Sequence, residues 1–128
     1  MDNKEIQKPF DLKKRCYFFS VQLVEFVKTT KYERIYFSMF DQLLRCGTWV
    51  GANVVEGGGG SSVKDVINFY HIALKSANET KYWLCLIRDS LETELEITNK
   101  LIQEADELSK IIASSLIKMK KNIGVIKN

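Results

Sequence analysis

Basic side chains that could contact a polyanion fall into two groups that lie far apart in the chain. The first is a consecutive run near the start of a predicted helix, and the second lies in a segment where no acidic residue follows Glu107. Closely spaced lysine and arginine side chains attract phosphate groups, so we predict nucleic-acid contacts here. The alternative is that they solvate helix faces and offset the helix dipole. The predicted contacts are Lys13, Lys14, Arg15, Lys118, Lys120 and Lys121.

A run of four glycines followed by two serines is the second candidate for chemistry, because glycine-rich loops can bind phosphate. Such a loop follows a strand and ends in Gly-Lys-Ser or Gly-Lys-Thr, and the sequence predicts neither feature. We predict instead that Gly57 adopts a left-handed conformation that ends one helix, and that Ser62 caps the next. Contact of an anion with the free amides at that helix start is the alternative. The predicted turn residues are Gly57, Gly58, Gly59 and Gly60.

The sequence contains no recognisable catalytic or metal-binding pattern. The single histidine, His71, is not part of a Glu-x-x-His pair of the kind that holds two metals in helical bundles. No serine or cysteine stands in a sequence context that marks a nucleophile. We therefore expect no catalytic residue, no metal, no cofactor and no enzyme activity.

The cellular location is predicted from the cysteines and from the lack of long apolar runs. The three cysteines are far apart and form no Cys-x-x-Cys, which suits reduced thiols in a cytoplasm. No apolar run reaches the ~20 residues that span a bilayer. The polar N-terminus is not followed by the apolar stretch of a signal peptide. We expect a cytoplasmic protein that does not insert into a membrane.

Four long helices are the elements that must position these residues. Apolar residues recur at alternating steps of three and four, the spacing of a buried seam, over approximately residues 10–29, 33–56, 63–91 and 94–121. Short connections between them predict one all-α domain, residues 1–128, folded as an antiparallel up-down-up-down four-helix bundle.

Local signals refine this expectation. We expect Gly47 and Gly51, which lie on nearly the same side of the second helix, to allow the close approach of a neighbouring backbone. Thr93 and Glu96 are predicted to form a capping box at the start of the fourth helix. Three large apolar residues lie off the seams, and we predict a subunit or partner interface for them, with partial burial at a helix flank as the alternative. They are Trp49, Trp83 and Leu86.

Several short motifs resemble those of a known family. The sequence resembles the four-helix-bundle proteins encoded in intervening sequences of 23S ribosomal RNA genes. Those proteins show Gln-x-x-Arg, Asn-Ile-Ala-Glu-Gly, a phenylalanine with Ile-Ala, and Gly-Ser-x-x-Glu. Here Val54 and Val55 replace the first Ile-Ala pair, Lys75 replaces the glycine before the serine, and the glycine run replaces a commonly basic loop. The matching residues are Gln42, Arg45, Asn53, Glu56, Gly57, Phe69, Ile72, Ala73, Ser76 and Glu79.

The resemblance implies a bacterial protein that assembles as a homopentameric ring of bundles. It extends to the accessory variability determinants of diversity-generating retroelements, which share that assembly and bind a reverse transcriptase and its template RNA. By this resemblance, Arg45 would pair with Glu79 of the same or a neighbouring chain. Asn53 would hydrogen-bond to Ser76 across two helices, and Glu56 would belong to the same set of structural or interface polar residues.

These expectations favour a non-catalytic, homo-oligomeric accessory protein. It would bind nucleic acid, either RNA or RNA with DNA, and a reverse transcriptase is a candidate partner. The alternative is a structural adaptor whose off-seam aromatic side chains dock a protein partner. In that case the basic residues would only solvate the surface.

Overall fold

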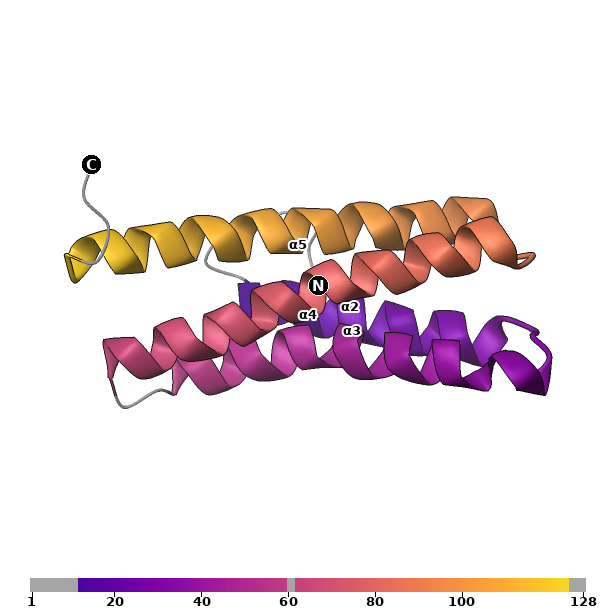
Figure 1. Ribbon diagram of the computed structural model, residues 1–128, viewed down its shortest axis with the longest axis horizontal. Coiled ribbons are helices and arrows are strands. Elements are labelled where there is room, and N and C mark those ends of the chain that lie inside the picture. Colours follow the sequence, from indigo (N-terminus) through magenta and orange to yellow (C-terminus); the bar gives the residue numbers. More distant parts are fainter. Residues whose placement is uncertain (1–11, 60–61, 125–128) are drawn as a thin grey trace.

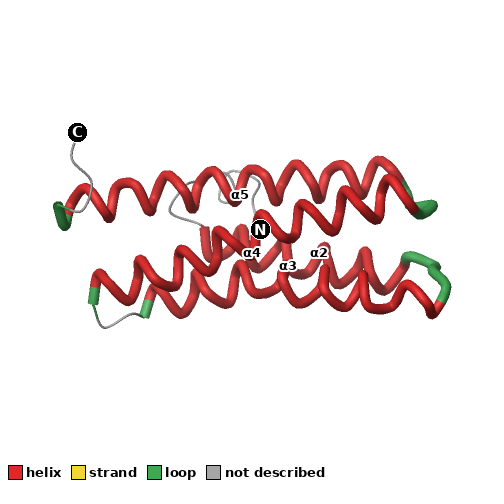
Figure 2. The backbone as a smooth tube through the Cα atoms, in the orientation of Figure 1, coloured by secondary structure: helices red, strands yellow, loops and turns green. Residues whose placement is uncertain are grey.

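The structure is a computed structural model that describes residues 12–59 and 62–124. Its elements follow each other along the chain as long antiparallel helices packed side by side (Figures 1 and 2). The sequence prediction of an all-α up-down four-helix bundle is confirmed. The elements are α2 (Leu12–Thr29), the short 3-10 helix η2 (Arg34–Tyr36), α3 (Phe37–Gly58), α4 (Val63–Ser90) and α5 (Leu95–Asn122).

Most of the core lies at positions that the apolar spacing predicts, although Leu116 is buried in place of Ser115 and Phe37 and Val55 are exposed. In α2 the buried residues follow steps of four, three, four and three, and α4 and α5 bury residues at the same kind of spacing. Each fully buried Leu or Phe stabilises the fold by about 1.5–3 kcal/mol through removal of apolar surface from water. The α2 residues are Leu12, Cys16, Phe19, Leu23 and Phe26.

None of the helices described combines the length and apolar character that a bilayer crossing demands.

Two glycines make room for α2 against α3, and the predicted close approach of a neighbouring backbone is confirmed at Gly51, whereas Gly47 faces side chains. A methyl group added at Gly51 would lie 3.1 Å from the Cβ atom of Cys16 and 3.6 Å from its carbonyl carbon and oxygen. At Gly47, an added methyl group would collide with the side chain of Leu23, which is fully buried. The absence of side chains at these positions therefore lets the two helices pack closely, which offsets the low helix propensity of glycine.

The end of α3 differs from the prediction. The helix continues through Gly57 to Gly58, so Gly57 does not take the left-handed conformation that we expected. Gly124 is the one residue with a positive φ in the described ranges. Gly57 is buried, and an added methyl group would lie 3.0 Å from the ring of Tyr70, so its role is packing against α4. Gly58 ends the helix and Gly59 caps it, whereas Gly60 lies outside the described residues.

One of the two predicted helix caps is confirmed. The Ser62 hydroxyl accepts a hydrogen bond from the Asp65 amide at 3.2 Å and caps α4. The predicted capping box of α5 is wrong, because the helix starts at Leu95 and its N-cap residue, Glu94, makes no side-chain cap. Thr98 instead donates its hydroxyl proton to the Glu94 carbonyl at 2.8 Å, with the Thr93 hydroxyl 3.0 Å away. The hydroxyls bond to each other, so Thr93 does not reach the amides.

Gly47→Ala should destabilise the bundle by up to about 2 kcal/mol. Overpacking of the new methyl group against the buried Leu23 side chain costs about 1–3 kcal/mol, and the gain in helix propensity offsets about 1 kcal/mol of this cost. The measurement is urea unfolding of the variant and the wild type.

The matched control for this prediction is Gly58→Ala. The atoms nearest to its new methyl group belong to the flexible end of the exposed Lys13 side chain, which can move away. A Gly47→Ala variant as stable as Gly58→Ala would contradict the packing role of Gly47.

Candidate nucleic-acid interface

The fold places the two predicted basic groups in the same half of the bundle. Because neighbouring helices are antiparallel, α5 ends beside the α3–α4 connection, whereas α2 begins well inward of that end (Figure 1). The end of the Lys13 side chain lies against Gly58, the last residue of α3, and Lys64 follows in the first turn of α4. We call this group the basic end, and its members are Lys13, Lys14, Lys64, Lys118, Lys120 and Lys121.

The basic end is accessible to a large ligand. All of its lysines are exposed except Lys120, which is half-buried. Lys120 and Lys121 lie in the last turn of α5, where their positive charge also interacts favourably with the helix dipole. Lys64 was missed by the sequence reasoning because it is a single lysine next to an aspartate. The signal that could have found it is its place directly after the glycine loop, which an up-down topology puts at this end.

Arg15 does not belong to this surface, and the structure corrects its predicted role. Its guanidinium donates two hydrogen bonds to the Glu104 carboxylate, at 2.8 and 3.0 Å, and Glu107 lies 3.9 Å away. The hydrogen bond to Glu104 raises the pKa of Arg15, and only 17% of its side chain is exposed. The Arg15 guanidinium therefore forms a bidentate ion pair that joins α2 to α5, and it does not face a ligand.

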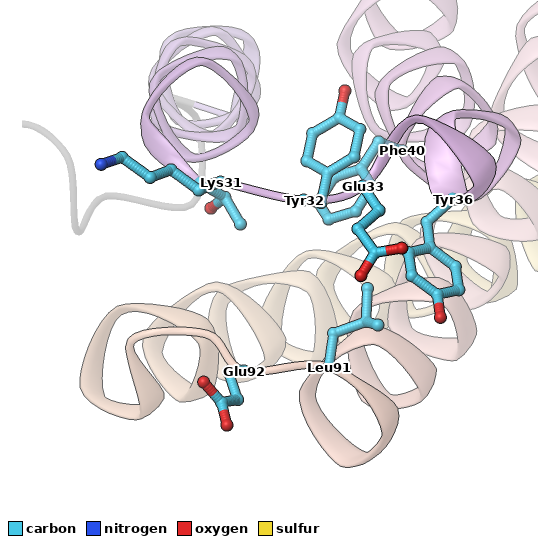
Figure 3. A pocket seen from close by; sticks show the side chains of 8 residues that line it. Lys31, Tyr32, Glu33, Tyr36, Phe40, Leu91 and Glu92 are labelled. Carbon is cyan, nitrogen blue, oxygen red and sulfur yellow. The ribbon is translucent and has the colours of Figure 1, made fainter.

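The opposite end of the bundle carries a hollow of about 360 Å³ between the α2–α3 and α4–α5 connections. The rings of Tyr32 and Phe40 stack there with centroids 3.8 Å apart, at an interplanar angle of 9°. The Glu33 carboxylate extends between Tyr36 and Leu91 (Figure 3). Two carboxylates, of Glu33 and Glu92, line the hollow against a single lysine. This lining opposes phosphate binding in the hollow, although the exposed Lys28, Lys31 and Arg34 also lie toward this end of the bundle.

Four polar residues of the family motifs, Gln42, Arg45, Ser76 and Glu79, line a shallow hollow of about 230 Å³ between α3 and α4, whereas Asn53 and Glu56 do not line it. The predicted pair between Arg45 and Glu79 does not form within the chain. Arg45 is 70% exposed and binds Asp41 in its own helix at 3.1 Å, because the two residues are one helical turn apart. Glu79 accepts a long hydrogen bond, 3.5 Å, from the Trp83 indole. The pairing of Arg45 with Glu79 of a neighbouring chain stays a prediction.

Asn53 and Ser76 do not bond across the helices either. The side-chain amide of Asn53 donates to the carbonyl of Trp49 at 2.8 Å, within α3. The polar contact that does cross from α3 to α4 is buried, with Thr80 Oγ1 lying 3.3 Å from Cys46 Sγ. Sequence reasoning missed this contact because neither residue stands out by type or spacing.

The off-seam apolar residues differ in exposure. Trp49 is 56% exposed and lines the same hollow as Arg45 and Glu79. Trp83 is half-buried and makes an edge contact with Tyr82, with ring centroids 5.3 Å apart, and Leu86 is also half-buried. Partial burial at a helix flank thus accounts for Trp83 and Leu86, whereas Trp49 keeps the exposure that an interface residue needs.

The buried thiols are chemically unreactive, and the acidic groups do not cluster into a metal site in the part of the chain that the structure describes. Burial raises the pKa of the Cys16 thiol to about 12 and also raises that of Cys46, so both stay protonated and unreactive at neutral pH. Over residues 12–59 and 62–124, no group of three or more His, Cys, Asp or Glu side chains could hold a metal ion.

The fold and the charge distribution define the class of protein as a small up-down four-helix bundle with one basic end. Residues 8–114 match the family of the 23S rRNA-intervening sequence protein, and the chain belongs to that family. It is also similar to the crystal structure of a protein with unknown function from the S23 ribosomal protein family of Bacteroides thetaiotaomicron. That protein is 38% identical, with a TM-score of 0.73, over 82% of this chain and 97% of the other. No curated protein matches the chain.

Removal of the buried guanidinium tests the structural role of Arg15. Arg15→Gln should lower the free energy of unfolding by roughly 1–3 kcal/mol, because it breaks charge-assisted hydrogen bonds in a partly buried setting. The control, Lys100→Gln, removes an exposed ion pair with Glu96 and should change stability by at most about 0.5 kcal/mol. Equal effects in thermal or urea unfolding would contradict this account, as would a large loss of RNA affinity in a folded Arg15→Gln protein.

Proposed function

We propose that this protein is a non-catalytic accessory protein that binds nucleic acid through its basic end. The observation that carries the proposal is the gathering of three separate lysine groups, from the starts of α2 and α4 and the end of α5, in one half of the bundle. The charges at the opposite end include the carboxylates of Glu33 and Glu92. Closely spaced lysines displace counterions from phosphates together, which favours binding to RNA or to RNA with DNA.

The proposal includes assembly into a homopentameric ring with a reverse transcriptase as partner. Its support is the resemblance to the accessory variability determinants of diversity-generating retroelements. Exposed Trp49 and Arg45 on the outer face of α3 would meet a neighbouring copy, and Glu79 of that copy would be the partner of Arg45. A ring of five chains, each with a net charge of +3, would carry about +15 in total, which strengthens attraction of a polyanion.

The lysines at the end of α5 give the direct test. A triple variant with Lys118→Gln, Lys120→Gln and Lys121→Gln should bind RNA more weakly than the wild type. The slope of log affinity against log salt should become shallower by roughly 2, since each lost phosphate contact on a single strand contributes about 0.7. Fluorescence anisotropy with a labelled RNA across a salt series measures both quantities.

The control variant removes the same charge from the opposite end, with Lys28→Gln, Lys31→Gln and Arg34→Gln, all of which are exposed residues. It should keep most of the affinity and of the slope. If the two triple variants weaken binding equally, the basic end is not the contact surface and only the net charge matters.

A second candidate function is a structural adaptor that docks a protein partner. The observation in its favour is the exposure of Trp49, 56%, beside a hollow that also contains Arg45 and Glu79. Large aromatic residues of this kind often dominate binding at interfaces. In this case the lysines would contribute solubility alone.

Trp49→Ala should lower the native mass of the assembly, or abolish capture of a partner, while the circular dichroism of the helices stays unchanged. Ile35→Ala, at a residue that is 78% exposed on η2, is the control and should leave the native mass as it is. Light scattering gives the mass. A Trp49→Ala protein with wild-type mass and partner binding would remove Trp49 from both interface proposals.

A further inference from the structure

A groove of about 350 Å³ lies between α2 and α3, directly beside the basic end. Its floor is at Gly51, where the missing side chain lets α3 approach Cys16 of α2. Its volume falls at the lower end of the roughly 300–1,000 Å³ that is typical of small-ligand sites. The other residues that line it are Lys13, Tyr17, Ser20, Thr48, Ala52, Val55 and Glu56.

Tyr17 is the most distinctive residue of this groove. Its side chain is 69% exposed, and the ring contact recorded for it is edge-on, with Phe18, at a centroid distance of 6.5 Å. Tyr17 and Lys13 are four residues apart, so they lie on the same side of α2, one turn from each other. An aromatic ring beside a lysine is the combination with which proteins hold single strands, since the ring stacks on a base and the cation contacts the phosphate.

The lining is mostly apolar, and its few polar groups suit the edge of a base. The Thr48 hydroxyl donates its proton to the Leu44 carbonyl at 2.8 Å, which leaves its oxygen free to accept. Glu56 adds a carboxylate, an acceptor that suits the exocyclic amino group of a base but repels a phosphate. A phosphate would therefore stay at Lys13, toward the end of the bundle, while the base enters the groove.

We propose that this groove binds an unpaired base of a single-stranded nucleic acid, with Tyr17 as the stacking platform and Lys13 as the contact to the adjacent phosphate. The proposal rests on the nucleic-acid function argued above and narrows it to single strands. In a duplex, both faces of each base are covered by its neighbours, so Tyr17 has no surface to stack on.

The test compares the native assembly on two strands of equal length and charge, a single-stranded oligocytidine and an abasic sugar-phosphate strand. The wild type should bind the oligocytidine roughly 5- to 150-fold more tightly, the range expected for stacking of one base. Tyr17→Ala should abolish this difference and leave the affinity for the abasic strand unchanged. Tyr17→Phe should keep the difference, because stacking needs the ring and not the hydroxyl.

The matched control is Tyr82→Ala, at a residue that is 61% exposed on α4 and does not line the groove. It should behave like the wild type. Equal affinity of the wild type for both strands would overturn the groove proposal while leaving phosphate binding at the basic end intact. A difference that persists in Tyr17→Ala, or a changed native mass that shows the groove to be a contact between copies, would overturn it too. If neither strand binds, the nucleic-acid function itself fails.

Discussion

The close packing of α3 against α2 is the constraint on which the other features depend. Gly47 and Gly51 fix how near the two helices lie, because a methyl group at either position would press on Leu23 or Cys16. This packing holds α2 beside α3, where the end of the Lys13 side chain lies against Gly58, the last residue of α3. The same contact leaves the groove between the helices with a backbone floor. A packing requirement of the core thereby shapes the surface.

The antiparallel topology gathers lysines in one half of the molecule. Lysines from the starts of α2 and α4 and from the end of α5 lie in that half, whereas the carboxylates of Glu33 and Glu92 line the hollow at the opposite end. The ion pair of Arg15 with Glu104 holds the start of α2 to α5 and removes one cation from the surface.

The sequence predicted the parts of the structure that depend on local spacing. Steps of three and four marked the buried side of α2, and a serine after glycines marked the cap of α4. The sequence did not predict which side chains would pair between helices. Arg15 and Glu104, for example, are 89 positions apart, and nothing local links them. Gly57 was mistaken for a helix stop because the ring of Tyr70, which requires a glycine there, comes from another helix. The lysines of the candidate site other than Lys64 were identified by type, but their gathering in one half of the bundle follows only from the topology.

The most direct test of the account is RNA binding by the purified assembly across a salt series, with the native mass recorded in each buffer. The account predicts an intact oligomer whose log affinity falls linearly and steeply with log salt, as expected when several lysines contact phosphates together. An intact oligomer that fails to bind RNA at low salt would contradict it. The lysines would then be surface residues only, and the partner of this bundle would be a protein.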